Sequence, residues 1–422
     1  MVGLSTVGTA YPSRLLGVDL ARLLALVGMF AAHLTVVDGA EVPVLFQVVA
    51  GRSSALFALL AGVSLVLVTR DVGVGTIGVH RARLLVRAGV VALVGLVLGL
   101  LDSGVAVILT YYGLLFCCAL PVLRWRASSL AWLALAWGLA SPALSLVLRS
   151  VLPPSSYQVP SLLSLANPWQ LLTELAVTGY YPVLTWATYL FAGMAAGRAL
   201  APALTGARAG RAEGGDGPAG RGRSADHRVP LRTLRILLLV GVWLAALALG
   251  VSAWATRSPG VRQALLDSWG VTDRWSDLAT VLRTGFYGTH PEGSWWWLAV
   301  WAPHSGSVVD LAHTTGAALV VLASCLLLVR VTGTLPWRVL SGAGAMTLTL
   351  YAAHVVVLGT AGRQGALGRE GEHALLLHAA AAVLLGAGFA LARRRGPLER
   401  WVGAATLAAV PDARTSPPPP SG

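Results

Sequence analysis

The sequence has no lysine, only three cysteines and few charged residues: charged side chains make up 12% of the chain and hydrophobic ones 56%. So little charge and so much apolar surface exclude an ordinary water-soluble domain. Apolar runs of bilayer-spanning length also recur along the chain, as in a membrane protein. We interpret the absence of lysine, with all 31 basic residues arginine, as a nucleotide-composition bias. Cys117, Cys118 and Cys325 lie in apolar runs without paired spacing, which argues against a disulfide framework or a cysteine metal site.

The net charge of +13 would suit a nucleic-acid partner, but the arginines lie between hydrophobic runs, where the positive-inside rule explains them. We therefore expect no nucleic-acid partner. If the N-terminus is cytoplasmic, most arginines fall in cytoplasmic segments, which predicts an even number of spans and both termini inside. The first apolar run is too long for a signal peptide and is interrupted by Asp19 and Arg22, which indicates a permanent first span.

The apolar runs predict an all-α, polytopic transmembrane bundle of about ten spans in the plasma (cytoplasmic) membrane. A membrane domain is expected over residues 1–400, followed by a cytoplasmic tail, 401–422, that is disordered at its end. A Gly-, Ala- and Arg-rich inner loop at 201–230 has little to bury and is expected to be disordered. Two long outer loops are rich in aromatic residues, which could be interfacial anchors or a platform for a sugar acceptor: 150–181 and 256–307. The predicted spans are 15–37, 48–68, 84–101, 105–123, 129–149, 182–200, 232–255, 308–330, 339–361 and 373–392.

The first span carries an acid and a base near one end and a histidine near the other. Asp19 and Arg22 are three residues apart and can pair on one helix face. His33 lies eleven residues beyond Arg22, about 16 Å further along a helix. Ionisable groups are costly in lipid, so these side chains are expected to face protein or a wet cavity. Asp19 cannot reach His33, and whatever orients that imidazole must come from elsewhere in the chain.

Titratable groups from five predicted helices fall at one outer depth, which predicts a polar cavity that opens outward. Structural alternatives remain. Ser307 and Asp310 have the spacing of a capping box. Tyr111 and Tyr112 suit an interfacial belt, and Arg52 suits the membrane interface. Four other histidines are interpreted as solvated or packing residues: His80, His227, His373 and His378. The outer group comprises His33, Arg52, Tyr111, Tyr112, His304, Asp310, His313, Tyr351 and His354.

Several motifs resemble those of known membrane enzymes. The run GVDLARLLALVGMFAAH resembles the first-span signature of the membrane acyltransferase superfamily. The run GRSSALFALLAGVSL is similar to the second-span motif of a bacterial branch related to heparan-α-glucosaminide N-acetyltransferase. Further similar segments are YYGLLF, GYYPVLTWATYLFAGMAAGR, HSGSVVDLAHTTGAAL, GAMTLTLYAAHVVVL and RGPLERW. The resemblance implies transfer of an acetyl or similar acyl group from cytoplasmic acyl-CoA to a hydroxyl or amine of an extracytoplasmic glycan or glycolipid.

The resemblance also implies residue roles. His33 matches the catalytic histidine, and Arg22 matches the arginine of the first span. We expect Arg22, with Asp19, to bind the acyl-CoA, because the guanidinium offers positive charge to its phosphates. A neutral, buried imidazole suits a general base, while Arg52, His304 or a tyrosine could stabilise the oxyanion. The other outer groups are expected to line the substrate cavity, without a metal. One departure is that the human-type enzyme has an asparagine where His33 stands, so this role follows the bacterial O-acyltransferase pattern.

The expected partners are membrane lipid and the glycan or glycolipid acceptor, and a homodimer is left open. A membrane transporter or lipid flippase with a polar outward cavity is the alternative function. Such a protein would more usually show internal repeats, or helices broken by Gly or Pro at corresponding positions of two halves. The sequence contains no convincing repeat, which favours the enzyme.

Overall fold

The structure, a computed structural model, describes residues 14–37, 41–70, 74–204, 225–334, 336–361 and 371–411. Within these ranges the chain is helical and forms no β-sheet. The main bundle helices are α1 (Leu16–Leu34), α3 (Arg52–Val68), α4 (Ile77–Leu98), α5 (Leu109–Ala119), α6 (Ala127–Arg149), α8 (Val183–Leu200), α11 (Leu231–Arg257), α14 (Val308–Thr332), α15 (Trp337–Ala345), α16 (Thr347–Ala361) and α17 (Glu372–Leu391). The shorter helices are α2 (Val44–Val49), η1 (Val74–Thr76), η2 (Leu162–Ala166), α7 (Pro168–Thr173), η3 (Glu174–Thr178), α10 (Ala225–Arg228), α12 (Pro259–Trp269), α13 (Trp275–Thr284), η4 (Trp295–Ala299) and α18 (Pro397–Ala409).

Helices occur at all ten predicted spans, which confirms the all-α bundle. Among the described residues, six helices are long and apolar enough to cross a membrane, and the bent pair of α15 and α16 would make a seventh. The six are α1, the continuous segment of α2 and α3, α6, α11, α14 and α17. A total of about ten spans, and a cytoplasmic position for both termini, stay predictions.

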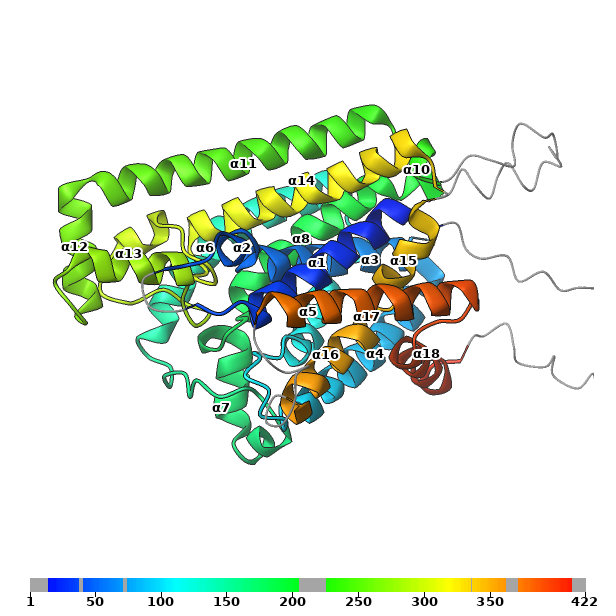
Figure 1. Cartoon of the computed structure of the whole chain (residues 1–422), viewed down its shortest axis with the longest axis horizontal. Helices are drawn as coiled ribbons and strands as arrows, with labels where there is room; N and C mark the ends of the chain where they lie inside the picture. Colours follow the sequence, from blue (N-terminus) through cyan, green and yellow to red (C-terminus); the bar gives the residue numbers. More distant parts are fainter. Residues whose placement is uncertain are drawn as a thin grey trace, which may run out of the picture.

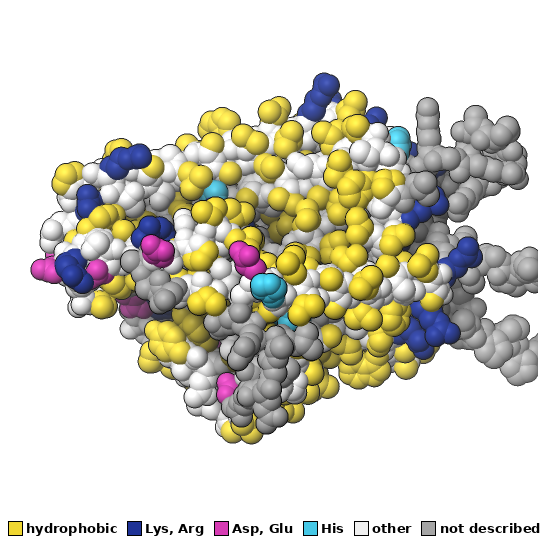
Figure 2. Space-filling view, viewed as in Figure 1, with side chains coloured by type: hydrophobic (Ala, Val, Ile, Leu, Met, Phe, Trp, Pro, Cys, Tyr) yellow, Lys and Arg dark blue, Asp and Glu magenta, His cyan; other side chains and the backbone are white. Residues whose placement is uncertain are grey.

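The bundle has two chemically different ends. Figure 1 shows α10, α15 and α18 at one end of the long axis and α7, α12 and α13 toward the other. On the visible face, basic side chains gather at the first end without acidic ones, basic and acidic side chains mix toward the other end, and hydrophobic side chains cover much of the middle (Figure 2). We call the end with α10, α15 and α18 the inner end and the opposite one the outer end, after the predicted topology.

α1 lies at the centre of the bundle, where it packs against α3, α14 and α15. Small residues permit these close approaches. A Cβ added to Gly17 would lie 2.6 Å from the Cα of Leu326 on α14. A Cβ on Gly344 of α15 would likewise overlap the backbone of Asp19 on α1. The helix that carries the candidate residues is thus enclosed by its neighbours rather than surrounded by lipid.

The prediction of one continuous span over 339–361 is wrong. α15 and α16 meet at a bend of 67°. The carboxylate of Glu399, on α18, accepts hydrogen bonds from the backbone N–H groups of Leu348 (2.9 Å) and Thr349 (3.2 Å). It therefore caps a new helix start in the middle of the predicted span, as a capping side chain does at an ordinary N-terminus.

The outer loop 256–307 is folded. Its helices α12, α13 and η4 enclose a small hydrophobic core of their own. Trp297 is 1% exposed in this core, and its indole N–H donates to Ser268 Oγ at 2.9 Å. Trp297 therefore has a packing role and cannot belong to an exposed sugar platform. Most of the loop 201–230, and the end of the tail, lie outside the described residues.

Candidate functional site

A cavity of about 610 Å³ opens at the inner end of the bundle. It lies between the N-terminal half of α1 and the segments around α3, α15, α17 and α18. This volume is within the range of small-molecule sites, and the excess of guanidinium groups favours an anionic ligand. The charged residues that line it are Arg14, Arg22, Arg70, Arg338, Arg393, Arg394, Arg395, Asp19 and Glu399.

Asp19 and Arg22 pair at the wall of this cavity, as predicted. Asp19 is 3% exposed and accepts a hydrogen bond from Arg22 at 2.8 Å and another from Arg14 at 3.2 Å. Arg22 also donates to the Ser64 hydroxyl on α3. A buried carboxylate needs such partners, because an unpaired charge in the interior is strongly destabilising. The network therefore holds the Arg22 guanidinium at the cavity wall.

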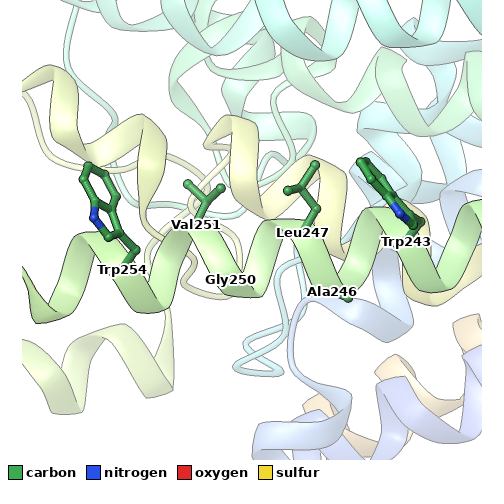
Figure 3. A pocket seen from close by; sticks show the side chains of 6 residues that line it. All are labelled: Trp243, Ala246, Leu247, Gly250, Val251 and Trp254. Atoms are coloured by element: carbon green, nitrogen blue, oxygen red, sulfur yellow. The ribbon is translucent and has the colours of Figure 1, made fainter.

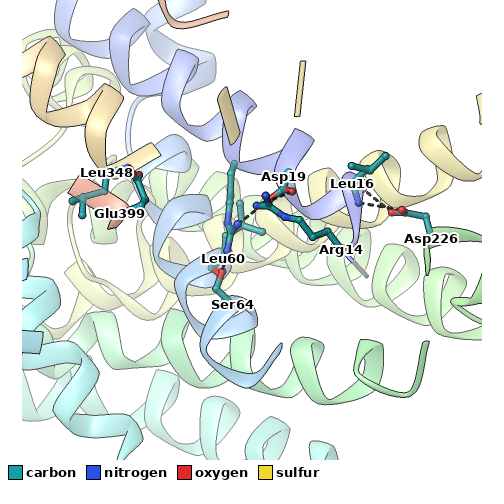
Figure 4. A network of polar contacts seen from close by, with 10 residues as sticks. Arg14, Leu16, Asp19, Leu60, Ser64, Asp226, Leu348 and Glu399 are labelled. Carbon is teal, nitrogen blue, oxygen red and sulfur yellow. Dashed lines mark hydrogen bonds and ion pairs between the residues drawn. The ribbon is translucent and has the colours of Figure 1, made fainter. Parts of the chain in front are cut away.

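Asp226 holds the start of α1, a role that the sequence did not reveal. Its two carboxylate oxygens accept hydrogen bonds from the backbone N–H groups of Leu16 (3.0 Å) and Gly17 (2.9 Å), and its side chain is fully buried (Figure 4). Burial raises the pKa of Asp226, and the two N–H groups oppose that rise. Leu15 supplies no side-chain cap, so Asp226 satisfies backbone donors that α1 itself leaves free.

His33, near the other end of α1, contacts His354 on α16. His33 Nδ1 lies 3.2 Å from His354 Nε2, and the two rings are stacked with centroids 5.4 Å apart. Phe30, one turn earlier on α1, stacks on the ring of His354, with the two ring centroids 4.2 Å apart. The partner of His33 therefore comes from a different helix, as the spacing along α1 required.

His304 lies in the outer loop before α14, in a left-handed backbone conformation with φ of 57°. The loop is held on both sides of it. His290 N–H donates to Ser305 O at 2.8 Å, and Gly306 N–H donates to Asp310 Oδ2 at 3.0 Å. A left-handed conformation is unfavourable for a non-glycine residue, so these bonds determine where the imidazole lies.

Aromatic rings surround His304. Its ring centroid is 4.7 Å from that of Tyr180, 5.7 Å from that of Tyr181 and 6.4 Å from that of Trp186. Burial, and secondarily the nearby His33, lower the pKa of His304 to about 3. The imidazole is therefore neutral near pH 7. Its Nδ1 is buried and has no hydrogen-bond partner among the described residues.

The capping alternative for Ser307 and Asp310 is confirmed in part. Ser307 Oγ accepts from Asp310 N–H at 2.9 Å, as an N-cap does. The Asp310 carboxylate does not return to Ser307 but binds Gly306 N–H, so it fixes the His304 loop. Its second oxygen, Oδ1, is buried without a partner in the described part of the chain.

Arg52 and His313 form a hydrogen-bonded pair beside this loop. Arg52 Nε donates to His313 Nε2 at 2.9 Å, and the guanidinium lies over the ring of Trp301 at 4.7 Å from its centroid. A guanidinium only donates, so His313 carries its proton on Nδ1, which lies 3.4 Å from Ala245 O. The backbone of Gly51, before Arg52, packs closely on Pro303.

The interfacial-belt alternative for Tyr111 and Tyr112 is wrong, because both are buried, as is Tyr351. The Tyr111 hydroxyl accepts a hydrogen bond from Tyr180 N–H at 3.1 Å. The Tyr351 hydroxyl accepts one from Ile108 N–H at 3.3 Å. The Tyr112 hydroxyl is buried and unpartnered within the described ranges. Tyr111 thus joins the aromatic group around His304, while Tyr351 shares α16 with His354.

The sequence-predicted residues therefore fall into two groups. Asp19 and Arg22 lie at the cavity of the inner end, and the other residues form neighbouring clusters toward the outer end. Sequence reasoning missed Asp226 and His290 and did not assign a role to the aromatic residues Tyr180, Tyr181 and Trp186. A dense aromatic run at the start of a predicted span was the available signal for these three. In the described part of the chain, no group of three or more His, Cys, Asp or Glu residues could hold a metal ion.

A second hollow, of about 530 Å³, lies on the surface of α11 between Trp243 and Trp254 (Figure 3). Its remaining lining residues are Ala246, Leu247, Gly250 and Val251. None of these side chains can exchange a proton near neutral pH or carry a charge. This groove is therefore not a candidate for catalysis.

The comparisons with known proteins agree with the resemblance. No match was found among the curated proteins. A family model described as heparan-alpha-glucosaminide N-acetyltransferase, catalytic, matches residues 14–217. The matched segment includes Asp19, Arg22, His33, Arg52 and the two tyrosines of α5, whereas His304 and His354 lie beyond it. Over residues 14–217, the chain is thus similar to the catalytic domain of heparan-α-glucosaminide N-acetyltransferase, and this similarity supports a membrane acetyltransferase kind of function.

Proposed function

We propose that the protein transfers an acetyl or similar acyl group from cytoplasmic acyl-CoA to a hydroxyl or amine of an extracytoplasmic glycan or glycolipid. The observation that carries this proposal is the polarity of α1. Its N-terminal half forms the wall of a cavity rich in arginine, and its C-terminal end carries His33 in an imidazole pair. About 16 Å of helix separates Arg22 from His33.

The inner cavity supports acyl-CoA as the donor. Coenzyme A carries a diphosphate and a further phosphate, and arginine binds phosphate oxygens through paired N–H groups. The cavity is lined by the exposed run Arg393, Arg394 and Arg395 and by the half-buried Arg22, which Asp19 holds. The residues present therefore suit the nucleotide end of this substrate. When bound, acyl-CoA supplies the acyl group as an activated thioester.

The outer residues have distinct roles in the proposed reaction. His33 takes the proton from the acceptor hydroxyl or amine as that group attacks the thioester carbonyl, and later returns a proton to the departing thiolate. A general base of this kind contributes about 10² to 10⁴ in rate. Arg52 and His304 are proposed to stabilise the carbonyl oxygen as it becomes negative. Asp310, His313, Tyr111, Tyr112, Tyr351 and His354 are proposed to line or shape the acceptor site.

The proposed topology follows from the same arrangement. The inner end faces the cytoplasm, where acyl-CoA is available, and the outer end faces the space that contains the glycan. Both chain termini are then cytoplasmic, and the protein lies in the plasma membrane. The mechanism needs one copy of the chain, so a homodimer stays a prediction without a role in the chemistry.

The test uses purified protein in detergent, radiolabelled acetyl-CoA and an extract of cell-envelope lipids and polysaccharides. Wild-type protein should release CoA thiol and label the extract. His33→Ala should abolish both, while the control His373→Ala, at an exposed histidine near the start of α17, should retain them. Full activity of folded His33→Ala would remove His33 from the mechanism. Substrate flux into liposomes without CoA release would favour the transporter instead.

A further inference from the structure

Three histidines from three helices lie in contact at the outer half of the bundle. His354 of α16 lies between His33 of α1 and His378 of α17. The His354 and His378 rings have centroids 4.9 Å apart, and their planes meet at 85°. Phe30 stacks on His354 at 4.2 Å and contacts the edge of His378 at 6.0 Å. His378, interpreted from sequence as a solvated or packing residue, therefore belongs to the surroundings of His33.

The position of the proton on His378 is fixed by its own helix. His378 Nδ1 lies 2.8 Å from the carbonyl oxygen of Ala374. A carbonyl oxygen only accepts hydrogen bonds, so a neutral His378 carries its proton on Nδ1. Its Nε2 then bears a lone pair. That nitrogen is buried and has no partner among the described residues.

The bond between His33 Nδ1 and His354 Nε2 could run in either direction. If His354 Nε2–H donates, His354 Nδ1 bears a lone pair and can only accept a hydrogen bond. His378 Nε2 can also only accept, so these two nitrogens cannot pair with each other. If His33 Nδ1–H donates instead, His354 carries its proton on Nδ1, which can donate to His378 Nε2. Both orphan nitrogens, His354 Nδ1 and His378 Nε2, are buried and unpartnered in the described ranges. Only the second direction can satisfy them, and unsatisfied buried groups are costly.

We propose that His33, His354 and His378 form a directed hydrogen-bond chain that ends on the carbonyl of Ala374 and holds the His33 proton on Nδ1. In this chain His33 Nδ1–H donates to His354 Nε2, His354 Nδ1–H to His378 Nε2, and His378 Nδ1–H to Ala374 O. The ring centroids of His354 and His378 lie 4.9 Å apart, and the middle bond forms when the two rings turn so that these nitrogens face each other. His354 and His378 are positioning residues, because they act through His33.

The chain has a chemical consequence for the proposed acyl transfer, on which it rests. A proton held on Nδ1 leaves the lone pair of His33 on Nε2, the nitrogen that can take a proton from the acceptor. The opposite tautomer would leave no free lone pair on His33 and could not act as a base. The partner of a catalytic imidazole commonly sets the tautomer in this way.

The test combines turnover with the state of the His33 ring. His354→Phe keeps a ring that can stack on Phe30 but removes both hydrogen bonds. His354→Gln keeps an oxygen that can accept from His33 and an amide that can donate to His378. His373→Phe, at the exposed histidine five residues before His378, is the matched control. Acyl transfer from labelled acetyl-CoA and ¹⁵N NMR of histidine-labelled protein are measured for each.

In the wild type, the ¹⁵N spectrum should show His33 protonated on Nδ1 with a lone pair on Nε2. His354→Phe should lose this single tautomer and lower turnover by about 10² to 10⁴-fold, the range of a general-base contribution, without changing KM for acetyl-CoA. His354→Gln should restore most of the turnover, and His373→Phe should match the wild type. A His33 proton on Nε2, or full turnover of folded His354→Phe while His33→Ala is inactive, would overturn the chain but not the proposed function. Full turnover of His33→Ala would contradict the function itself.

Discussion

Replacing Asp226 by alanine should loosen the start of α1. The carboxylate accepts hydrogen bonds from the N–H groups of Leu16 and Gly17 at 3.0 and 2.9 Å, and it is 0% exposed. A buried donor left without a partner costs about 1–3 kcal/mol. Because two donors lose their partner, Asp226→Ala should lower the free energy of unfolding by about 2–6 kcal/mol.

Two control variants separate the lost cap from a general effect of mutation. Asp226→Asn keeps one carbonyl oxygen, so its loss of stability should be intermediate. The exposed Asp267 bonds to Gln263 on the surface of α12. Asp267→Ala should therefore change the free energy of unfolding by no more than about 0.5 kcal/mol.

The assay is thermal unfolding of detergent-solubilised protein, together with the KM for acetyl-CoA. Asp226→Ala should lower Tm by several degrees. It should also raise KM, because α1 carries Asp19 and Arg22 to the cavity wall. An unchanged Tm for Asp226→Ala, equal to that of Asp267→Ala, would refute the reasoning that this carboxylate stabilises α1.

Three further predictions concern the inner cavity and the outer loop. Glu399→Ala should lower the free energy of unfolding by about 1–3 kcal/mol and reduce turnover, because it removes the cap of α16, the helix that carries His354. Glu399→Gln should have a smaller effect on both. Tm and turnover are measured for each variant. Burial lowers the pKa values of His304 and His290 from 6.5 to about 3 and about 4. Below about pH 6.5 the unfolded chain therefore binds protons more readily than the folded one, so the free energy of unfolding should be highest above that pH. As the pH drops, it should fall by up to about 1.4 kcal/mol per pH unit for each histidine. His304→Gln and His290→Gln should each reduce this slope in unfolding curves measured between about pH 7.5 and 5. The double change of Arg394 and Arg395 to Ala should raise the KM for acetyl-CoA about tenfold without altering kcat, and an unchanged KM would argue against phosphate binding by this run.

Local pairings could be predicted from the sequence because helix geometry fixes them. Asp19 and Arg22 are three residues apart on one apolar helix, and they pair as that spacing requires. Ser307 caps α14 for the same reason. The apolar runs likewise predicted where helices form, because an apolar segment that crosses lipid has to satisfy its backbone hydrogen bonds internally, as a helix does.

Long-range partners could not be predicted. His33 and His354 are 321 residues apart, and Asp226 lies 209 residues from Gly17. The bend between α15 and α16 depends on Glu399, which reaches α16 from another helix. A pattern within one run of residues carries no information about which other run packs beside it.

The sequence by itself determined that the chain is a helical membrane protein, which segments form helices, and that α1 carries a charged pair at one end and an imidazole at the other. Only the tertiary structure decided what these groups meet. His373 and His378 are both histidines of α17, yet one is exposed and the other contacts His354. The difference arises because helix packing, rather than residue type, decides which face of α17 is buried and therefore which imidazole can reach the site.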